Sequence, residues 1–230
     1  MNPKTVTSVE LQARCDQLVA QHLDALLQLR QDVVTLVREA GSTLSVRWPD
    51  PAEIHGQLFC TLVRGLLLNE LMGRQDPDKP APAGVLRTRC GPGMSVVMED
   101  LKGGRWRVRR VPSEFVLDHG RLVVYPSKAA ADAVRSGKPV PDQASFGPEF
   151  DSLPRTVRSD AYDWFVLWAL SEDAIQVPSV FLAAVHDIDN PSKVVVLAQT
   201  QLPVVAAAAE GDFEEYRGTG GAESAGPENA

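Results

Sequence analysis

Apolar residues recur at helical spacing through the N-terminal part of the chain. Two rows of them run from about residue 8 to residue 40 and form a stripe wider than a coiled-coil seam. Thr7 and Glu10 have the spacing of a capping box, and Gly41 is a natural stop. The pattern predicts one long N-terminal helix. The rows are Leu11, Cys15, Leu18, Ala25, Leu29 and Leu36, and Val19, Leu23, Leu26, Val33 and Val37.

A second helix is predicted from its own start signals. Asp50 can cap it, Pro51 suits the first helical position, and Glu53 stands where a capping box needs an acid. Apolar periodicity then continues to about Gly73, and it is dense enough to predict a central position in the fold. Between the two helices, the alternation over residues 44–48 predicts a short strand.

A proline-rich connection over residues 75–84 separates this helical front from a β-rich middle. Short runs with strand character follow it, joined by segments rich in glycine and proline. Tight turns between short runs predict an antiparallel meander. The expected strands cover residues 85–89, 94–100, 105–111, 114–117 and 121–125.

The last third of the chain mixes both periodicities. An aromatic-rich helix is expected from about residue 160 to residue 171. The runs 180–185 and 193–199 predict a strand pair, and since both are apolar on both faces they should lie inside a covered sheet. A short helix is expected to begin at residue 127, and a final helix is expected over residues 203–216.

The elements together predict an α+β fold in which the long N-terminal helix and the second helix pack on a mostly antiparallel β-sheet. Residues 1–74 form the helical N-terminal part, and residues 85–209 form the β-rich α+β part of the same globular unit. Residues 210–230 are acidic and poor in apolar side chains, so we expect a largely disordered C-terminal tail.

Charge changes this picture because it is unevenly distributed. The formal net charge of -7 argues against general binding of polyanions. Residues 85–110, however, hold seven lysines and arginines against two acids, whereas residues 210–230 hold six acids against one arginine. The basic segment is therefore the first place to look for a partner site.

The sequence RWRVRR at residues 105–110 places its arginines on one face of a strand and Trp106 on the other. Two more arginines share a face on the strand before last, so all five could align across the sheet, with Glu99 or Asp100 near their middle. The candidate partner- or phosphate-binding residues are Arg87, Arg89, Arg105, Arg107 and Arg109.

Several interpretations of this face stay open. It is a solvated surface whose arginines pair with acids elsewhere, a site for a protein partner, or a nucleic-acid site that uses the forked donors of arginine on phosphates. Trp106 faces away from the arginines, which leaves a nucleic-acid site without a stacking platform. The acidic segment EGDFEEY in the tail is a further candidate partner by charge alone.

Two other places carry weaker signals. His186, Asp187 and Asp189 put three polar groups at a strand end, as weak candidates for metal ligands or for the site of a small hydrolase-like enzyme. The same residues suit a polar turn, which is the favoured interpretation. Trp164 is a candidate hot spot for a protein partner if it is exposed, although a core position is favoured.

The remaining chemistry is sparse. Cys15, Cys60 and Cys90 are widely spaced with no CxxC pair, and no common phosphate-binding, dinucleotide-binding, hydrolase or metalloprotease motif is present. No cofactor is implied and no motif assigns the chain to a family. Neither a signal peptide nor an apolar run long enough to span a bilayer is visible, so a cytoplasmic location without a membrane partner is expected.

These observations favour a non-catalytic protein-interaction or assembly protein. The long N-terminal helix packs along its own domain or serves as an arm for self-association, and both interpretations stay open. A nucleic-acid-binding module that uses the basic sheet face is the first alternative. A small hydrolase-like enzyme with a site near His186, Asp187 and Asp189 is the second. Another protein or a second copy of the chain is the favoured partner.

Overall fold

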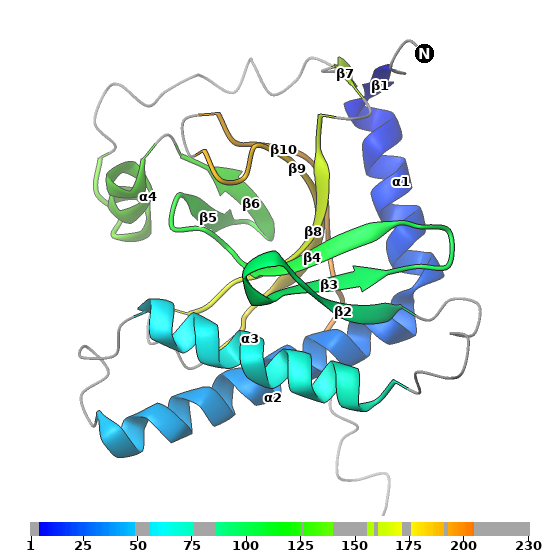
Figure 1. Ribbon diagram of the computed structural model, residues 1–230. Helices are drawn as coiled ribbons and strands as arrows, with labels where there is room; N and C mark the ends of the chain where they lie inside the picture. The colour runs from blue at the N-terminus through cyan, green and yellow to red at the C-terminus, as the bar shows by residue number, and fades with distance from the viewer. Residues whose placement is uncertain are drawn as a thin grey trace, which may run out of the picture.

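The computed structural model describes residues 5–48, 56–75, 86–125, 127–139, 156–158, 161–171, 176–190 and 193–204. Within these ranges, four α-helices and a six-stranded, mostly antiparallel sheet form the predicted α+β fold (Figure 1). The acidic tail and nearly all of the helix expected over residues 203–216 lie outside the described residues, as does most of the proline-rich connection. None of the described helices is long and apolar enough to cross a membrane.

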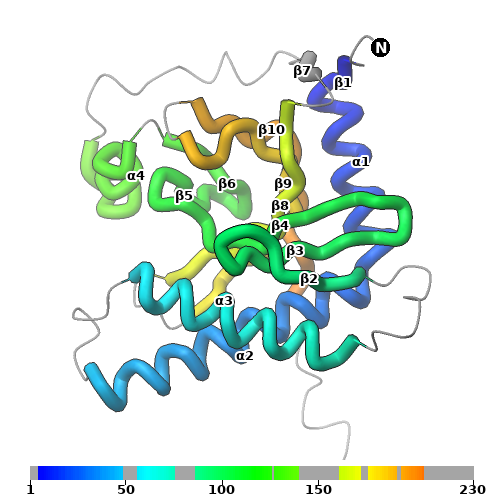
Figure 2. Tube along the Cα trace, in the orientation of Figure 1, coloured from blue at the N-terminus to red at the C-terminus, as the bar shows by residue number. Residues whose placement is uncertain are grey.

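The N-terminal stripe folds as two helices instead of one. Helix α1, Ser8–Gln21, begins with the predicted capping box, and helix α2, Leu23–Arg47, leaves it at a sharp angle (Figures 1 and 2). Between them His22 adopts φ -117° and ψ 23°, and its buried ring packs edge-on against Trp106, 5.1 Å between ring centroids. The prediction of one continuous helix is therefore wrong, because a tertiary contact bends a segment whose local pattern is uniformly helical.

Helix α2 also runs past the predicted stop. Gly41 lies inside it and the helix ends at Arg47, so the short strand expected over residues 44–48 is wrong. Leu44 is buried in line with the earlier part of the stripe, and this burial outweighs the cost of a glycine within a helix. Helix α3, Gly56–Gly73, packs against α2, whereas the predicted cap at residues 50–53 lies outside the described residues. Helix α4, Lys128–Arg135, is short and is capped by Ser127.

The main sheet has the strand order β10-β9-β8-β4-β3-β2. All neighbours are antiparallel except β4 and β8, which are parallel. The bounds are β2 Arg87–Gly91, β3 Ser95–Glu99, β4 Arg105–Arg110, β8 Asp163–Trp168, β9 Val180–His186 and β10 Val195–Gln201. A 3-10 turn, Pro92–Met94, links β2 to β3, and β1, Thr5–Thr7, pairs with β7, Thr156–Arg158, away from this sheet.

The predicted meander is correct for its first three strands and wrong for the last two. Strands β5, Phe115–Asp118, and β6, Arg121–Val124, leave the main sheet and form a separate hairpin. Its turn residues His119 and Gly120 both have positive φ, which is the geometry of a tight two-residue hairpin turn. The hairpin packs over the main sheet instead of extending it, because Phe115 and Leu122 bury against that sheet.

Strand β8 replaces the helix expected over residues 160–171. It is apolar from Trp164 to Trp168, and it lies between β4 and β9 with both faces covered. A strand buried on both faces reads as a continuous apolar run, which periodicity cannot distinguish from a buried helix. The strand pair formed by β9 and β10 is confirmed.

The sheet separates two hydrophobic cores. On one face, Trp106, Val166 and Leu182 pack with apolar side chains of α1, α2 and α3. On the other face, Phe165 and Phe181 pack under the β5–β6 hairpin. Along β2 and β4 the arginines alternate with side chains that point into the first core. They therefore point to the second face of the sheet, beyond the area that the hairpin covers.

Replacement of His22 tests how much the packing at the bend stabilises the fold. We expect His22→Asn to lower the free energy of unfolding by about 2 kcal/mol, since it removes the ring that packs on Trp106 and opens a small cavity. The matched control is His119→Asn, whose side chain is 94% exposed and whose loss should change stability by less than about 0.5 kcal/mol. Urea unfolding measures both, and equal stability of the two variants would contradict this role for His22.

The cysteines should differ in reactivity. Cys15 is buried, its Sγ lies 3.2 Å from the Leu182 carbonyl oxygen, and burial raises the pKa of its thiol to about 11. The thiol therefore stays protonated in mildly alkaline buffer, whereas Cys90 is exposed. In variants that keep one cysteine each, a disulfide reagent should modify Cys90 in the folded protein and Cys15 only in urea. Fast modification of folded Cys15 would show that α1 is not firmly packed.

Candidate functional site

Five arginine side chains project from one face of strands β2 and β4. The register of β3 aligns them: Glu99 pairs with Arg87 on one side and with Arg105 on the other, and Val97 pairs with Arg89 and Arg107 in the next row. We call this surface the arginine face, comprising Arg87, Arg89, Arg105, Arg107 and Arg109. The alignment follows from strand alternation in a three-stranded antiparallel unit, so the sequence alone could indicate it.

A shared carboxylate holds the middle of the arginine face. Oε1 of Glu99 lies 2.7 Å from Nη2 of Arg89 and 2.6 Å from Nε of Arg105. The side chains of these two arginines are 51% and 65% exposed, respectively. Each guanidinium carries five N–H donors, so one shared oxygen occupies only part of their capacity to bind carboxylate or phosphate groups.

Two further acids reach the face from elements distant in sequence. Arg107 lies over the ring of Phe165, 5.9 Å from its centroid, and its Nη2 is 3.7 Å from Oδ2 of Asp163 at the start of β8. Nη1 of Arg109 lies 2.5 Å from Oδ1 of Asp189 in the turn after β9. The arginine face therefore alternates positive and negative groups, with more of the former.

A shallow hollow of about 330 Å³ lies at the end of this face. Arg107 and Asp163 line it together with His186, Asp187 and Asp189, so the second candidate from the sequence adjoins the first. Nδ1 of His186 bonds the carbonyl oxygen of Ala161. The main chain of Asp187 has φ 50°, and its carbonyl oxygen accepts from the amide of Asn190 at 2.9 Å.

The contacts of these polar groups are those of a structured turn. His186 bonds a backbone oxygen and Asp189 bonds Arg109, so both side chains fix the loop between β9 and β10. No three His, Cys, Asp or Glu side chains in the described ranges are grouped so that they could hold a metal ion. The weak metal candidates His186, Asp187 and Asp189 therefore do not converge as a ligand set.

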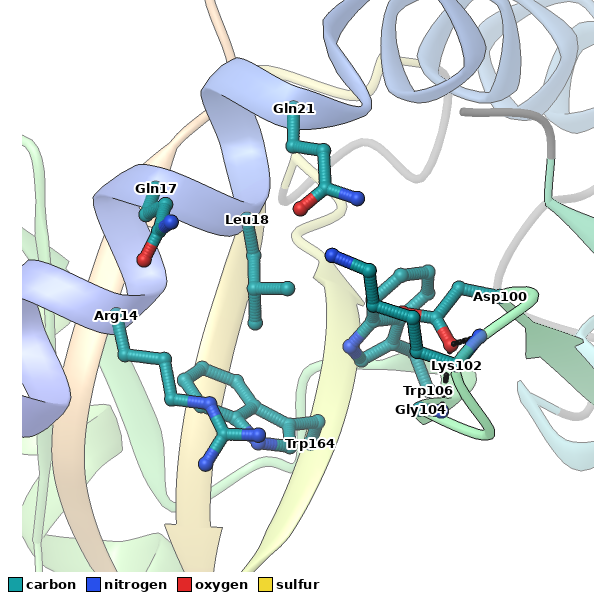
Figure 3. A pocket seen from close by; sticks show the side chains of 9 residues that line it. All are labelled: Arg14, Gln17, Leu18, Gln21, Asp100, Lys102, Gly104, Trp106 and Trp164. Carbon is teal, nitrogen blue, oxygen red and sulfur yellow. Dashed lines mark hydrogen bonds between the residues drawn. The ribbon is translucent and has the colours of Figure 1, made fainter. Parts of the chain in front are cut away.

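Trp164 occupies a half-buried position on β8, where a helix was expected. Its ring packs edge-on against Tyr162, 6.0 Å between centroids, and its cross-strand neighbour on β4 is Trp106. It packs against the larger core and also lines a second hollow, between α1 and the turn that joins β3 to β4 (Figure 3). Trp164 is thus neither fully core nor an exposed hot spot.

Three residues that complete these sites were not predicted from the sequence. Asp163 falls within the helix predicted over residues 160–171, and only the pairing of β8 with β4 brings it to Arg107. Arg14 and Lys102 line the second hollow but lie in an exposed helix face and a turn, where charged residues are ordinary. No local signal marked any of the three.

The fold and these surfaces define an α+β protein with a six-stranded mixed sheet, an arginine-bearing face with one hollow at its end, and a second hollow beside α1. Comparison with known proteins finds no protein-family model that matches the chain. No curated protein and no solved structure matches it either.

The arginine face should contribute little to folding. We expect the double change Arg105→Ala and Arg107→Ala to alter the free energy of unfolding by less than about 1 kcal/mol, because exposed ion pairs are weak. Trp106→Ala, between them on the buried face, should cost about 3–5 kcal/mol. Urea unfolding of both variants checks this contrast. If the arginine pair costs as much as the tryptophan, the face is structural.

Proposed function

We propose that this chain is a non-catalytic protein-interaction protein whose arginine face binds an acidic segment of a partner protein. The observation that carries the proposal is the row of five guanidinium groups, aligned across β2, β3 and β4 and interrupted by discrete carboxylates. Forked donors suit carboxylate groups in two-point contacts, and residues of such a partner could exchange with Glu99 or Asp163 as acceptors.

The interleaved acids favour a protein partner over nucleic acid. A phosphate backbone presents negative charge at regular spacing, and Glu99 and Asp163 would repel part of it. The aromatic groups near the face are also unsuited to stacking on bases, because Trp106 faces the opposite side and Phe165 is 1% exposed. The carboxylates of an acidic peptide, in contrast, can be spaced so that each contacts an arginine and none lies next to Glu99 or Asp163.

The N-terminal helices expose little contiguous apolar surface through which the chain could self-associate. The apolar stripe of α1 and α2 packs inside the chain's own core. Exposed apolar residues on the helices, such as Val9 in α1, Val46 in α2 and Met72 in α3, are scattered. Because scattered apolar side chains are ordinary on protein surfaces, they do not define a dimer interface.

A binding titration tests the proposal. A fluorescent oligoglutamate peptide should bind the protein with an affinity that falls as salt rises, and Arg105→Ala with Arg107→Ala should weaken this binding about tenfold, as expected for two lost charge contacts. The control replaces two exposed arginines of α2, Arg38 and Arg47, by alanine, so it has the same net charge as the Arg105 and Arg107 variant. It should bind like the unchanged protein.

Single- and double-stranded oligonucleotides form the competing arm of this titration. Tighter binding of oligonucleotides than of the peptide, lost in the Arg105 and Arg107 variant, would replace the proposal with the nucleic-acid alternative. Equal losses in both double variants would show that binding follows net charge alone. Either outcome would reject the arginine face as a protein-binding site.

Removal of the central acid should act in the opposite direction. Glu99→Gln frees the guanidinium groups of Arg89 and Arg105 from their shared carboxylate, so we expect the acidic peptide to bind about three- to tenfold more tightly. Glu39→Gln, exposed on α2 on the other side of the sheet, makes the same change of charge away from the face and is the control. An unchanged or weaker affinity in Glu99→Gln would mean that Glu99 does not compete with the partner.

A further inference from the structure

A second hollow, of about 220 Å³, lies on the opposite side of the sheet from the arginine face. Figure 3 shows its walls: Arg14, Gln17, Leu18 and Gln21 descend from α1, Lys102 rises from the turn between β3 and β4, and the two tryptophans lie beneath. The hollow is separate from the surface used in the proposed function, since strand alternation points Trp106 and Arg107 to opposite faces.

The floor of this hollow is aromatic. Trp106 and Trp164 are cross-strand neighbours in the parallel pair β4–β8, and Leu18 of α1 faces them. Trp106 is 2% exposed, whereas Trp164 is half-buried and presents part of its ring to the opening. A flat apolar floor of this kind favours a planar ring, because offset aromatic contacts add to the burial of area.

The rim of the hollow is cationic. Arg14 and Lys102 reach it from opposite walls, and the amide of Gln21 lies beside Lys102 (Figure 3). The acid that lines it, Asp100, is 7% exposed, and its Oδ1 accepts from the amides of Lys102 at 2.8 Å and Gly104 at 2.6 Å. Asp100 therefore holds the turn, and the charge presented to an incoming group is positive.

The turn that forms one wall is held in place before any ligand binds. Besides the two amide contacts of Asp100, its Oδ2 lies 4.0 Å from Nε2 of the buried His22, whose ring packs on Trp106. A Cβ on Gly104 would lie 2.8 Å from Oδ2 of Asp100, so a glycine is needed for this close approach. Preorganised walls reduce the entropy that a ligand loses in ordering its site.

We propose that this hollow binds a small planar anion: a single aromatic ring system that carries a carboxylate or a phosphate. The ring lies on Trp164 and Leu18, and the anionic group lies between the guanidinium of Arg14 and the ammonium of Lys102. The volume admits one ring system with its charged group and excludes a long chain. The glutamine amides supply hydrogen bonds to ring heteroatoms or to the anion.

Nuclear magnetic resonance titration tests this proposal with defined probes. Benzoate and phenyl phosphate carry the same ring with different anions, so their relative affinities identify the preferred group. Either should shift the indole N–H signal of Trp164. Benzamide lacks the charge and cyclohexanecarboxylate lacks the planar ring, so each should bind about tenfold more weakly. Equal binding of benzamide, or no shift with either aromatic anion, would overturn the proposal.

Variants separate this site from the arginine face. Arg14→Gln and Lys102→Gln should each weaken the preferred anion about tenfold, since each removes a charge-assisted contact. Arg38→Gln, exposed on α2, and the Arg105 and Arg107 double alanine variant should leave the affinity unchanged. If Arg38→Gln weakens binding as much as Arg14→Gln does, the anion binds by general charge and the hollow is not its site.

Discussion

The packing of His22 against Trp106 is the contact on which the arrangement of the whole chain depends. A straight helix from Ser8 to Arg47 would be about 60 Å long, far longer than one face of this sheet. The bend divides it, so that Gln12 of α1 bonds the carbonyl oxygen of Gln199 on β10 at 3.0 Å, and Arg30 of α2 bonds the carbonyl oxygen of Leu202 at 2.7 Å. Both helices thereby cover one sheet from two directions.

The same contact fixes the face of the sheet to which each side chain of β4 points. With Trp106 2% exposed beneath the helices, alternation forces Arg105 and Arg107 outward on the other side of the sheet. The parallel pairing of β4 with β8 then places Asp163 within reach of Arg107 and Trp164 beside Trp106. Strand β4 thus contributes to the arginine face on one side and to the aromatic floor of the second hollow on the other. The different chemistry of the two surfaces follows from the one register in which β4 pairs with β8.

Local signals in the sequence correctly predict those elements that depend on residues close together along the chain. The Thr7–Glu10 capping box, strands β2 to β4 and the β9–β10 pair follow from spacing and turn residues, and the alignment of the arginines follows from alternation. The bend at His22 has neither proline nor glycine to mark it. Strand β8 is apolar on both faces, and its parallel partner lies more than fifty residues away. The helix predicted from this run therefore gives Asp163 and Trp164 the wrong surroundings, since long-range pairing decides what they contact.

The turn between β3 and β4 joins the arginine face to the aromatic hollow. The contacts of this turn indicate that the two surfaces bind their ligands independently. Glu99 belongs to the arginine face and the adjacent Asp100 belongs to the wall of the aromatic hollow. Asp100 is held by two backbone amides and lies near His22, so its contacts do not depend on the ion pairs of Glu99. Coupling between two sites requires an element with two arrangements that both sites bias. Changes at the two surfaces should therefore be additive in their effects on binding.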